Sequence, residues 1–191
     1  MFRTKISKDE VNLMPVVIFE GKITIVDELS KIQPAIDELL KYKIVGIDTE
    51  TKPSFTRGTH HKVSLVQIST LNHCFLFRLN KFEFPVALAE FLADENIKKI
   101  GLSLRDDLAG LNKQHPFKPA NCIDIQTIAQ NYGILELGLQ KIYAILFEKK
   151  NIQLATIDKL GKSGTHRTTA ALCCHRCLGQ FTNLRSIDER K

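Results

Sequence analysis

A short apolar segment that ends in two carboxylates constrains this chain more than any other feature. Ile44, Val45 and Ile47 have the character of a buried strand, and Asp48-Thr49-Glu50 follows at its end. Side chains two residues apart on a strand project from the same face, so Asp48 and Glu50 should converge. Two carboxylates that converge offer the hard oxygen ligands that Mg²⁺ or Mn²⁺ requires. Taken alone, however, such a pair is more often a solvated acidic strand end, so the rest of the chain has to decide.

The patterns around this segment predict a mixed α/β sheet. Alternating apolar residues after residue 62 predict two antiparallel strands that follow the first one as a meander. A glycine-containing turn at residues 20–21 predicts a hairpin near the N-terminus. Strands are expected over residues 16–19, 22–26, 44–50, 63–69, 74–79, 98–102 and 122–125, and helices over 29–42, 85–92, 103–113, 128–132 and 139–147. A meander followed by β-α-β-α implies a mixed sheet with helices on both faces.

Length and charge narrow the classes of protein. A chain of 191 residues is expected to form one domain with a proper core. Its net charge of +6 favours a polyanionic partner. The N-terminus leads into charged sequence without a long apolar run, so we expect no secretory signal, no membrane span and a cytoplasmic location. Five cysteines are an odd number, which argues against a disulfide framework.

A second pair of acids, Asp106 and Asp107, follows the strand predicted at residues 98–102. Here a strand passes through a turn of small residues into a helix, a geometry that places first-turn acids at the carboxyl edge of a sheet. Acids in the first turn of a helix also complement the helix dipole without any other role. The position alone leaves both interpretations open.

Three segments together resemble the DEDD 3′–5′ exonucleases, with ribonuclease D and the Werner-type exonuclease domains as the most similar members. They are Asp48-Thr49-Glu50, the strand Val63-Ser64-Leu65-Val66-Gln67-Ile68, and Leu104-Arg105-Asp106-Asp107-Leu108. The resemblance runs from about residue 5 to about residue 150, and it implies a ribonuclease H-like fold. It also implies an enzyme that releases nucleotides from the 3′ ends of single-stranded DNA or RNA, with no obligate protein partner evident.

The resemblance implies roles for three acids. Asp48 and Glu50 correspond to the metal ligands of the first motif. Asp107 corresponds to the aspartate of the second motif, because in the family that acid directly precedes an apolar helix residue, here Leu108; Asp106 is the alternative. The family uses two Mg²⁺ or Mn²⁺ ions to activate a water molecule and to stabilise the leaving 3′ oxygen.

A basic loop follows the first motif. Lys52, Arg57 and Lys62 are placed to neutralise substrate phosphates, and Phe55 to stack on a terminal base. A merely solvated loop would have the same composition. The four residues are therefore predicted nucleic-acid contacts that only the site geometry can test.

The third motif of the family, Tyr-x-x-x-Asp or a His variant, is absent. Tyr143 is the last tyrosine, and Phe147 occupies the position of the aspartate. Permitted codons for residues 171–180, read one base later, encode Tyr-x-x-x-Asp, and residues 158–162 in the same shifted frame give a family-like segment. We infer an exonuclease domain over residues 1–150, followed by an out-of-frame tail over 151–191. The C-terminal helix would then be lost and the activity impaired.

Two alternatives to an impaired enzyme remain open. One is a catalytically inactive module that binds nucleic-acid ends through the basic loop, and the other is a non-catalytic protein whose tail mediates contacts. A zinc site in the tail is not expected, because Cys173, Cys174, His175 and Cys177 lack the usual C-x₂₋₄-C spacing.

Overall fold

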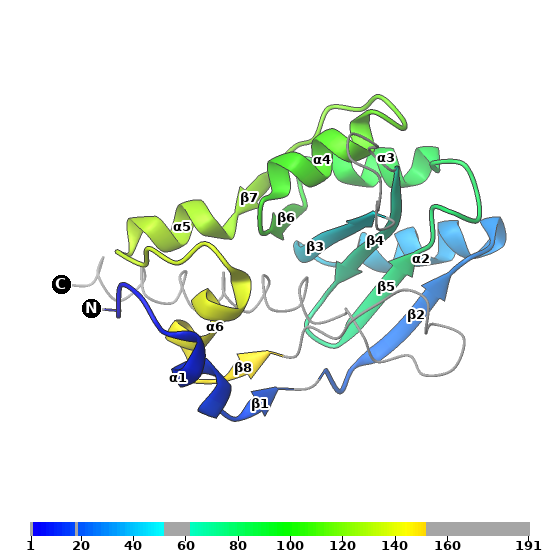
Figure 1. Ribbon diagram of the computed structural model, residues 1–191. Helices are drawn as coiled ribbons and strands as arrows, with labels where there is room; N and C mark the ends of the chain where they lie inside the picture. Colours follow the sequence, from blue (N-terminus) through cyan, green and yellow to red (C-terminus); the bar gives the residue numbers. More distant parts are fainter. Residues whose placement is uncertain (1, 18, 52–61, 152–191) are drawn as a thin grey trace, which may run out of the picture.

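The computed structural model describes residues 2–17, 19–51 and 62–151, which form a single α/β domain (Figure 1). The helices are α1 (Lys8–Leu13), the 3₁₀ turn η1 (Leu29–Lys31), α2 (Ile32–Leu39), α3 (Val86–Ala93), α4 (Leu104–Asn112), α5 (Ile125–Asn131) and α6 (Leu139–Phe147). The strands are β1 (Val16–Val17), β2 (Lys22–Val26), β3 (Ile44–Thr51), β4 (Val63–Ser69), β5 (His73–Phe77), β6 (Lys98–Gly101), β7 (Cys122–Asp124) and β8 (Lys150–Asn151).

Six strands form the central sheet in the order β2-β5-β4-β3-β6-β7. The neighbours β3, β4 and β5 are antiparallel, which confirms the predicted meander. The pairs β2–β5, β3–β6 and β6–β7 are parallel. A mixed sheet flanked by helices is the predicted fold class.

The predicted N-terminal hairpin is wrong. β1 pairs in parallel with β8, and β2 pairs in parallel with β5, so the two strands belong to different sheets. The alternation of apolar residues fixed which faces of the strands are buried, but both partners lie far along the chain. A local turn signal cannot report such a partner.

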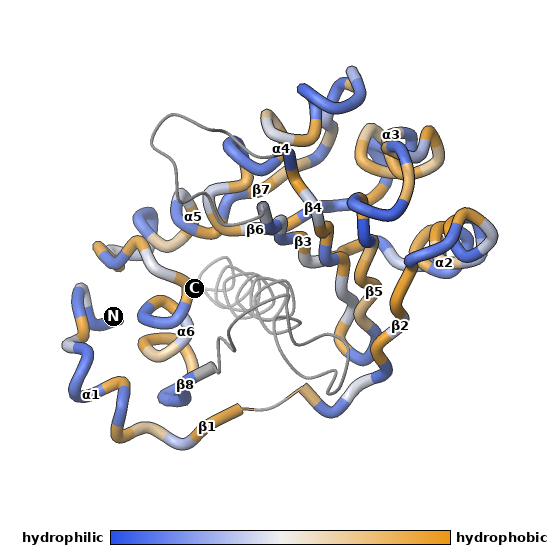
Figure 2. Tube along the Cα trace, turned by 45° about the vertical axis from the view of Figure 1, so that its right-hand side comes forward, coloured by the Kyte–Doolittle hydropathy of each residue, from blue (hydrophilic) through white to orange (hydrophobic). Residues whose placement is uncertain are grey.

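Helices cover both faces of the sheet. On one face, α2, α3 and α4 bury leucines and isoleucines against Val45, Ile47, Val66 and Ile68. On the other face, α1, α5 and α6 pack around Ile100 of β6. In Figure 2, apolar residues, drawn in orange, lie along β5, α3 and α6. β6 pairs with the first part of β3, from Ile44 to Gly46, whereas the carboxyl end of β3 pairs with β4 alone among the described strands.

Several helix boundaries differ from the predicted ones. The helix predicted over residues 29–42 begins as the 3₁₀ turn η1 and ends at Leu39, and α5 begins at Ile125 rather than at residue 128. α1 was not predicted, although Ser7 and Glu10 form a capping box at its start. Within the described residues, every helix is too short or too polar to span a lipid bilayer.

Candidate functional site

The first pair of acids lies on β3, where the strand leaves the core. Asp48 pairs across the strands with Gln67 of β4, and Glu50 pairs with Leu65. Gln67 is fully buried, and its Nε2 donates a hydrogen bond to Asp48 Oδ2 at 3.4 Å. The register shifts between Glu50 and Thr51. Such irregularities often lie beside sites, because they redirect side chains at a strand end.

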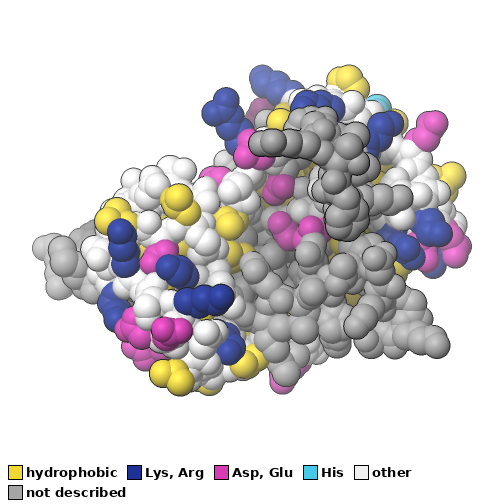
Figure 3. Space-filling view, viewed as in Figure 1, with side chains coloured by type: hydrophobic (Ala, Val, Ile, Leu, Met, Phe, Trp, Pro, Cys, Tyr) yellow, Lys and Arg dark blue, Asp and Glu magenta, His cyan; other side chains and the backbone are white. Residues whose placement is uncertain are grey.

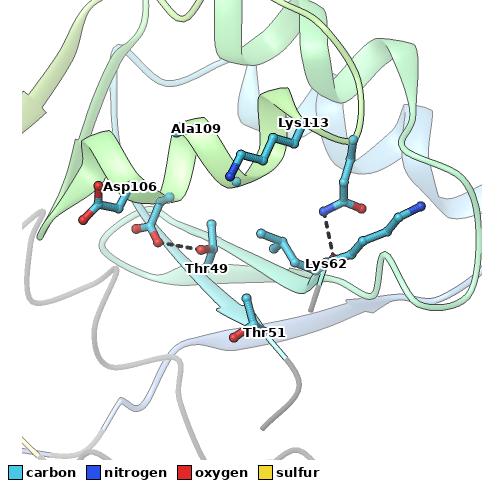
Figure 4. A pocket seen from close by; sticks show the side chains of 10 residues that line it. Thr49, Thr51, Lys62, Asp106, Ala109 and Lys113 are labelled. Carbon is cyan, nitrogen blue, oxygen red and sulfur yellow. Dashed lines mark hydrogen bonds between the residues drawn. The ribbon is translucent and has the colours of Figure 1, made fainter. Parts of the chain in front are cut away.

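Asp107 lies on the other side of this strand. The hydroxyl of Thr49 donates a hydrogen bond to Asp107 Oδ1 at 2.6 Å, drawn as a dashed line in Figure 4. Thr49 lies between Asp48 and Glu50 on β3, so this hydrogen bond places Asp107 beside the first pair of acids. Asp106, the alternative second-motif acid, is exposed, whereas Asp107 is half-buried. The structure therefore brings Asp107, and not Asp106, against the first motif.

Burial and neighbouring acids shape the electrostatics of Asp107. The pKa of this carboxyl is raised from its ordinary value of 3.8 to about 6, and burial is the largest cause. The charges of Glu50, Asp106 and Asp124 contribute to the rise, whereas the hydrogen bond from Thr49 opposes it. Three acids thus lie within electrostatic range of a fourth. A group with this environment is a candidate for a functional role.

Three hydrogen bonds fix α4 beside the sheet. The Leu104 amide donates to Asp124 Oδ2 at 3.0 Å, Thr49 bonds to Asp107, and Gln114 Nε2 donates to the Val63 carbonyl at 3.1 Å. These contacts tie the helix to β7, β3 and β4 in turn. Asp107 is therefore held from both ends of its helix.

The backbone that introduces α4 is unusual. Ser103, at the N-cap, has a φ of 55°, in the left-handed region, and its side chain makes no capping hydrogen bond. Gly101 lies two residues earlier, where a Cβ would meet the Ile47 carbonyl oxygen at 2.9 Å. Glycine lets β6 approach β3 closely, and the turn at Ser103 then sends the chain into α4 above that contact.

A cleft of about 490 Å³ opens beside Asp107, which we name the first cleft. It is lined by Thr49, Thr51, Lys62, Val63, Asp106, Asp107, Ala109, Gly110, Lys113 and Gln114. Figure 4 shows Lys113 reaching over the cleft from α4, with Lys62 near the start of β4. Acids at one end and two lysines farther along give this cleft opposite charges at its two ends.

The described acids do not yet form a closed metal site. Within residues 2–17, 19–51 and 62–151, no three His, Cys, Asp or Glu side chains lie close enough together to hold a metal ion. Acidic side chains nevertheless gather near the middle of the face shown in Figure 3, with basic side chains along its upper edge. The predicted ligands Asp48, Glu50 and Asp107 therefore occupy one region of the fold without converging on one point.

Some predicted contacts lie outside the described residues. Lys62 is exposed and lines the first cleft, and its role as a nucleic-acid contact stays a prediction. Lys52, Phe55 and Arg57 lie outside the described residues, and so does the tail after residue 151.

Three residues of the site were missed by the sequence reasoning: Thr49, Gln67 and Asp124. Gln67 is a polar residue in an otherwise apolar strand, and Asp124 is an N-cap type directly before a helix; both are readable signals. The Asp124 side chain accepts a hydrogen bond from the Gln126 amide, so it caps α5 as well as binding α4. No sequence signal reveals that Thr49 would contact Asp107.

The sequence model of the 3′–5′ exonuclease domain family matches residues 23–165, about three quarters of the chain. The chain belongs to this family. The match includes both acidic motifs and the strand that contains Gln67. Comparison with curated protein sequences finds no relative.

Solved structures of exonuclease domains share the fold. The catalytic core of RRP6 from Trypanosoma brucei is 16% identical and has a TM-score of 0.72, over 96% of this chain and 51% of that one. Trypanosoma brucei RNase D in complex with RNA U12 is 17% identical, with a TM-score of 0.67 over 86% and 62%. The Nibbler EXO domain of Aedes aegypti is 15% identical, with a TM-score of 0.66 over 87% and 89%. The chain thus spans about half of the RRP6 core and most of the Nibbler domain.

Proposed function

We propose that this chain is a metal-dependent 3′–5′ exonuclease domain whose metal ligands are Asp48, Glu50 and Asp107. The observation that carries the proposal is the environment of Asp107. This carboxyl is half-buried against Thr49, within electrostatic range of Glu50, Asp106 and Asp124, and its pKa is raised to about 6. A bound cation would relieve the repulsion among these acids and keep Asp107 ionised at neutral pH.

The donor atoms fit a hard divalent cation. Asp48, Glu50 and Asp107 offer only carboxylate oxygens, the ligands that Mg²⁺ and Mn²⁺ prefer. When bound, the metal would activate a water molecule and stabilise the leaving 3′ oxygen. The protein's own contribution is positioning: Thr49 orients the carboxylate of Asp107, and Gln67 donates to that of Asp48.

The proposed substrate is a single-stranded nucleic acid with a free 3′ end. Lys62 and Lys113 line the first cleft on the side away from the acids, so a strand whose terminal phosphate meets the acids could place further phosphates near the lysines. Lys52, Phe55 and Arg57 are proposed to add phosphate and base contacts. The structural relative RNase D was solved with RNA, which makes RNA the first substrate to test.

The missing third motif is proposed to impair this chain. Without its Asp, one carboxylate of the family's set is absent, and without its Tyr, the attacking water lacks a positioning group. Loss of one such group commonly lowers the rate by ~10²–10⁴-fold. If residues 151–191 are translated out of frame, restoring the frame should restore the motif.

A 3′-end digestion assay tests the proposal. A 5′-labelled single-stranded RNA and the matching DNA are incubated with this chain and with its frame-restored counterpart, in Mg²⁺, Mn²⁺ or EDTA. We expect the frame-restored chain to shorten the strand one nucleotide at a time with metal only, and this chain to be at least ~100-fold slower. Equal activity in the two chains would overturn the proposed impairment. Cleavage that persists in EDTA, or that survives an Asp48→Asn/Glu50→Gln double variant, would overturn the proposed metal site.

A further inference from the structure

A second cleft of about 500 Å³ lies beside the first one. It is lined by Lys62, Leu79, Asn80, Phe82, Glu83, Phe84, Gln114 and His115. Lys62 and Gln114 line both clefts, so the two are neighbours that share a wall. None of the residues predicted from the sequence, apart from Lys62, belongs to this second cleft.

A stack of three rings forms one side of the second cleft. The rings of Phe84 and His115 are parallel within 5°, with centroids 5.6 Å apart, and Phe117 stacks on Phe84 at 6.0 Å. Phe84 and Phe117 also pack against the hydrophobic core, which holds the stack in place. Within the described residues His115 stacks on Phe84 and not on Phe117, so it forms an end of this stack, and it is half-buried at the cleft. A flat ring at the end of a fixed stack is a platform for another flat ring.

The second cleft lies at a suitable distance from the acids. Asp107 and His115 are eight residues apart; α4 continues to Asn112, and the His115 amide bonds to the Leu111 carbonyl in the turn that follows. A rise of 1.5 Å per residue separates them by roughly 12 Å along the axis. A stacked strand advances about 3.4 Å per nucleotide. His115 therefore lies about three to four stacked nucleotides from the acidic end of the first cleft, and fewer if the strand is extended.

We infer that the second cleft binds a base of the substrate strand upstream of its 3′ end, stacked on His115, while Lys62 binds the phosphate between the two clefts. This inference rests on the proposed function, because it requires that a strand enters the first cleft. Base–aromatic stacking of this kind tolerates any base. Glu83 also lines the cleft, and its charge keeps phosphates toward the Lys62 side.

The inference predicts a dependence on strand length. A dinucleotide occupies the first cleft alone, whereas an octanucleotide also reaches His115. Fluorescence anisotropy in EDTA, where no strand is cut, measures the affinity of labelled oligouridylates of two, four and eight nucleotides. We expect His115→Ala to lower the affinity for the octanucleotide about tenfold and to leave that for the dinucleotide unchanged. His115→Phe, which keeps a flat ring, should retain most of the affinity.

Three further variants separate stacking from charge and from folding. His73→Ala is the matched control, because His73 is also half-buried and its ring contacts that of a phenylalanine, Phe75, at a tilt of 31°, but it lines neither cleft. It should leave both affinities unchanged. Lys62→Ala should lower the affinity for both oligonucleotides, and it should reduce the slope of log affinity against log salt concentration by about one. Lys118→Ala is the control for lost charge, because Lys118 is exposed and lines neither cleft.

Separate outcomes overturn the inference and the proposed function. Equal loss for short and long strands in His115→Ala, no loss at all, or no binding of any oligonucleotide would overturn the second cleft as a binding site. Digestion of 3′ ends with an unchanged length dependence would leave the exonuclease proposal standing without this cleft. Length-dependent binding without any metal-dependent digestion would leave the second cleft standing as a binding site and would overturn the exonuclease proposal.

Discussion

Helices α1 and α4 both begin with acids in the first turn. Folding shifts the pKa of one acid of each helix, Glu10 in α1 and Asp107 in α4, in opposite directions. In α1, Glu10 is solvated, bonds to the Ser7 amide and to Arg3, and its pKa falls from 4.5 to about 2. In α4, Asp107 is half-buried, its pKa rises to about 6, and its nearest charges are other acids. Both lie at the positive end of a helix dipole, which favours the charged form.

The difference shows what outweighs the helix dipole. At Glu10, hydrogen bonds from an amide and a guanidinium act on a carboxylate that water already solvates. At Asp107, burial removes water, and one hydroxyl cannot replace it while three acids add repulsion. The first arrangement stabilises a helix end. The second is unfavourable for the folded chain without a cation, as is usual for a site in which function outweighs stability.

The largest expected effect follows from Asp107→Asn. Metal affinity should fall by more than about 100-fold, since loss of even an outer-shell partner commonly costs 10–100-fold. At pH 7 without metal, the free energy of unfolding should rise by roughly 2–3 kcal/mol, because about two pKa units of unfavourable charge are removed. Calorimetry with Mn²⁺ and chemical denaturation in EDTA measure the two quantities.

The exposed Asp106 supplies the matched control on the same helix. Asp106→Asn should change both quantities far less. A destabilised Asp107→Asn protein would show that the carboxylate of Asp107 supports the fold, and the contrast between the two helix starts would then fail.

A smaller effect on stability should distinguish the serines at the N-caps of α1 and α4, Ser7 and Ser103. Ser7 accepts a hydrogen bond from the Glu10 amide at 3.1 Å, whereas Ser103 makes no side-chain cap bond and has a φ of 55°. Ser7→Ala should therefore cost about 1 kcal/mol. Ser103→Ala should cost little, and Ser103→Gly should be neutral or stabilising, because glycine adopts left-handed backbone without strain. Denaturant titration of the three variants is sufficient, and equal costs for the two alanine variants would contradict the assigned caps.

The smallest expected effect concerns pH and Glu10. Its pKa is lowered by folding, so its contribution to stability is present above about pH 4.5 and lost as the pH falls toward 2. Asp107 has the opposite sign: stability declines as the pH rises from about 4 to about 6. Thermal melts from pH 3 to pH 7 measure this contribution. The melting temperature of the chain with Glu10 should rise with pH, and part of that rise should be absent in Glu10→Gln. High salt should weaken the Glu10 contribution, and a salt-independent effect would argue against an exposed ion pair with Arg3.

The sequence predicted the parts of the fold that depend on local pattern. Alternating apolar residues placed β4 and β5, and the strand–turn–helix signature placed Asp107 at the sheet edge. The partners of β1 and β2 could not be predicted, because parallel pairing depends on segments far along the chain. At the site, the residue types of Asp48, Glu50 and Asp107 were readable. The contact from Thr49 was not, since it depends on how closely α4 packs on β3.

The N-terminal segment is fastened to the last part of the described chain. β1 pairs with β8, the Leu135 amide donates to the Thr4 carbonyl, and the Ile6 amide donates to Glu136. During synthesis at 5–20 residues per second, Ile6 and Val11 must therefore remain without their partners for roughly 7–30 s, until residue 150 has been made. The first helix of the chain is thus among the last to dock. A ribosome that stops early would release a chain with an exposed apolar N-terminus, a form that chaperones and proteases recognise.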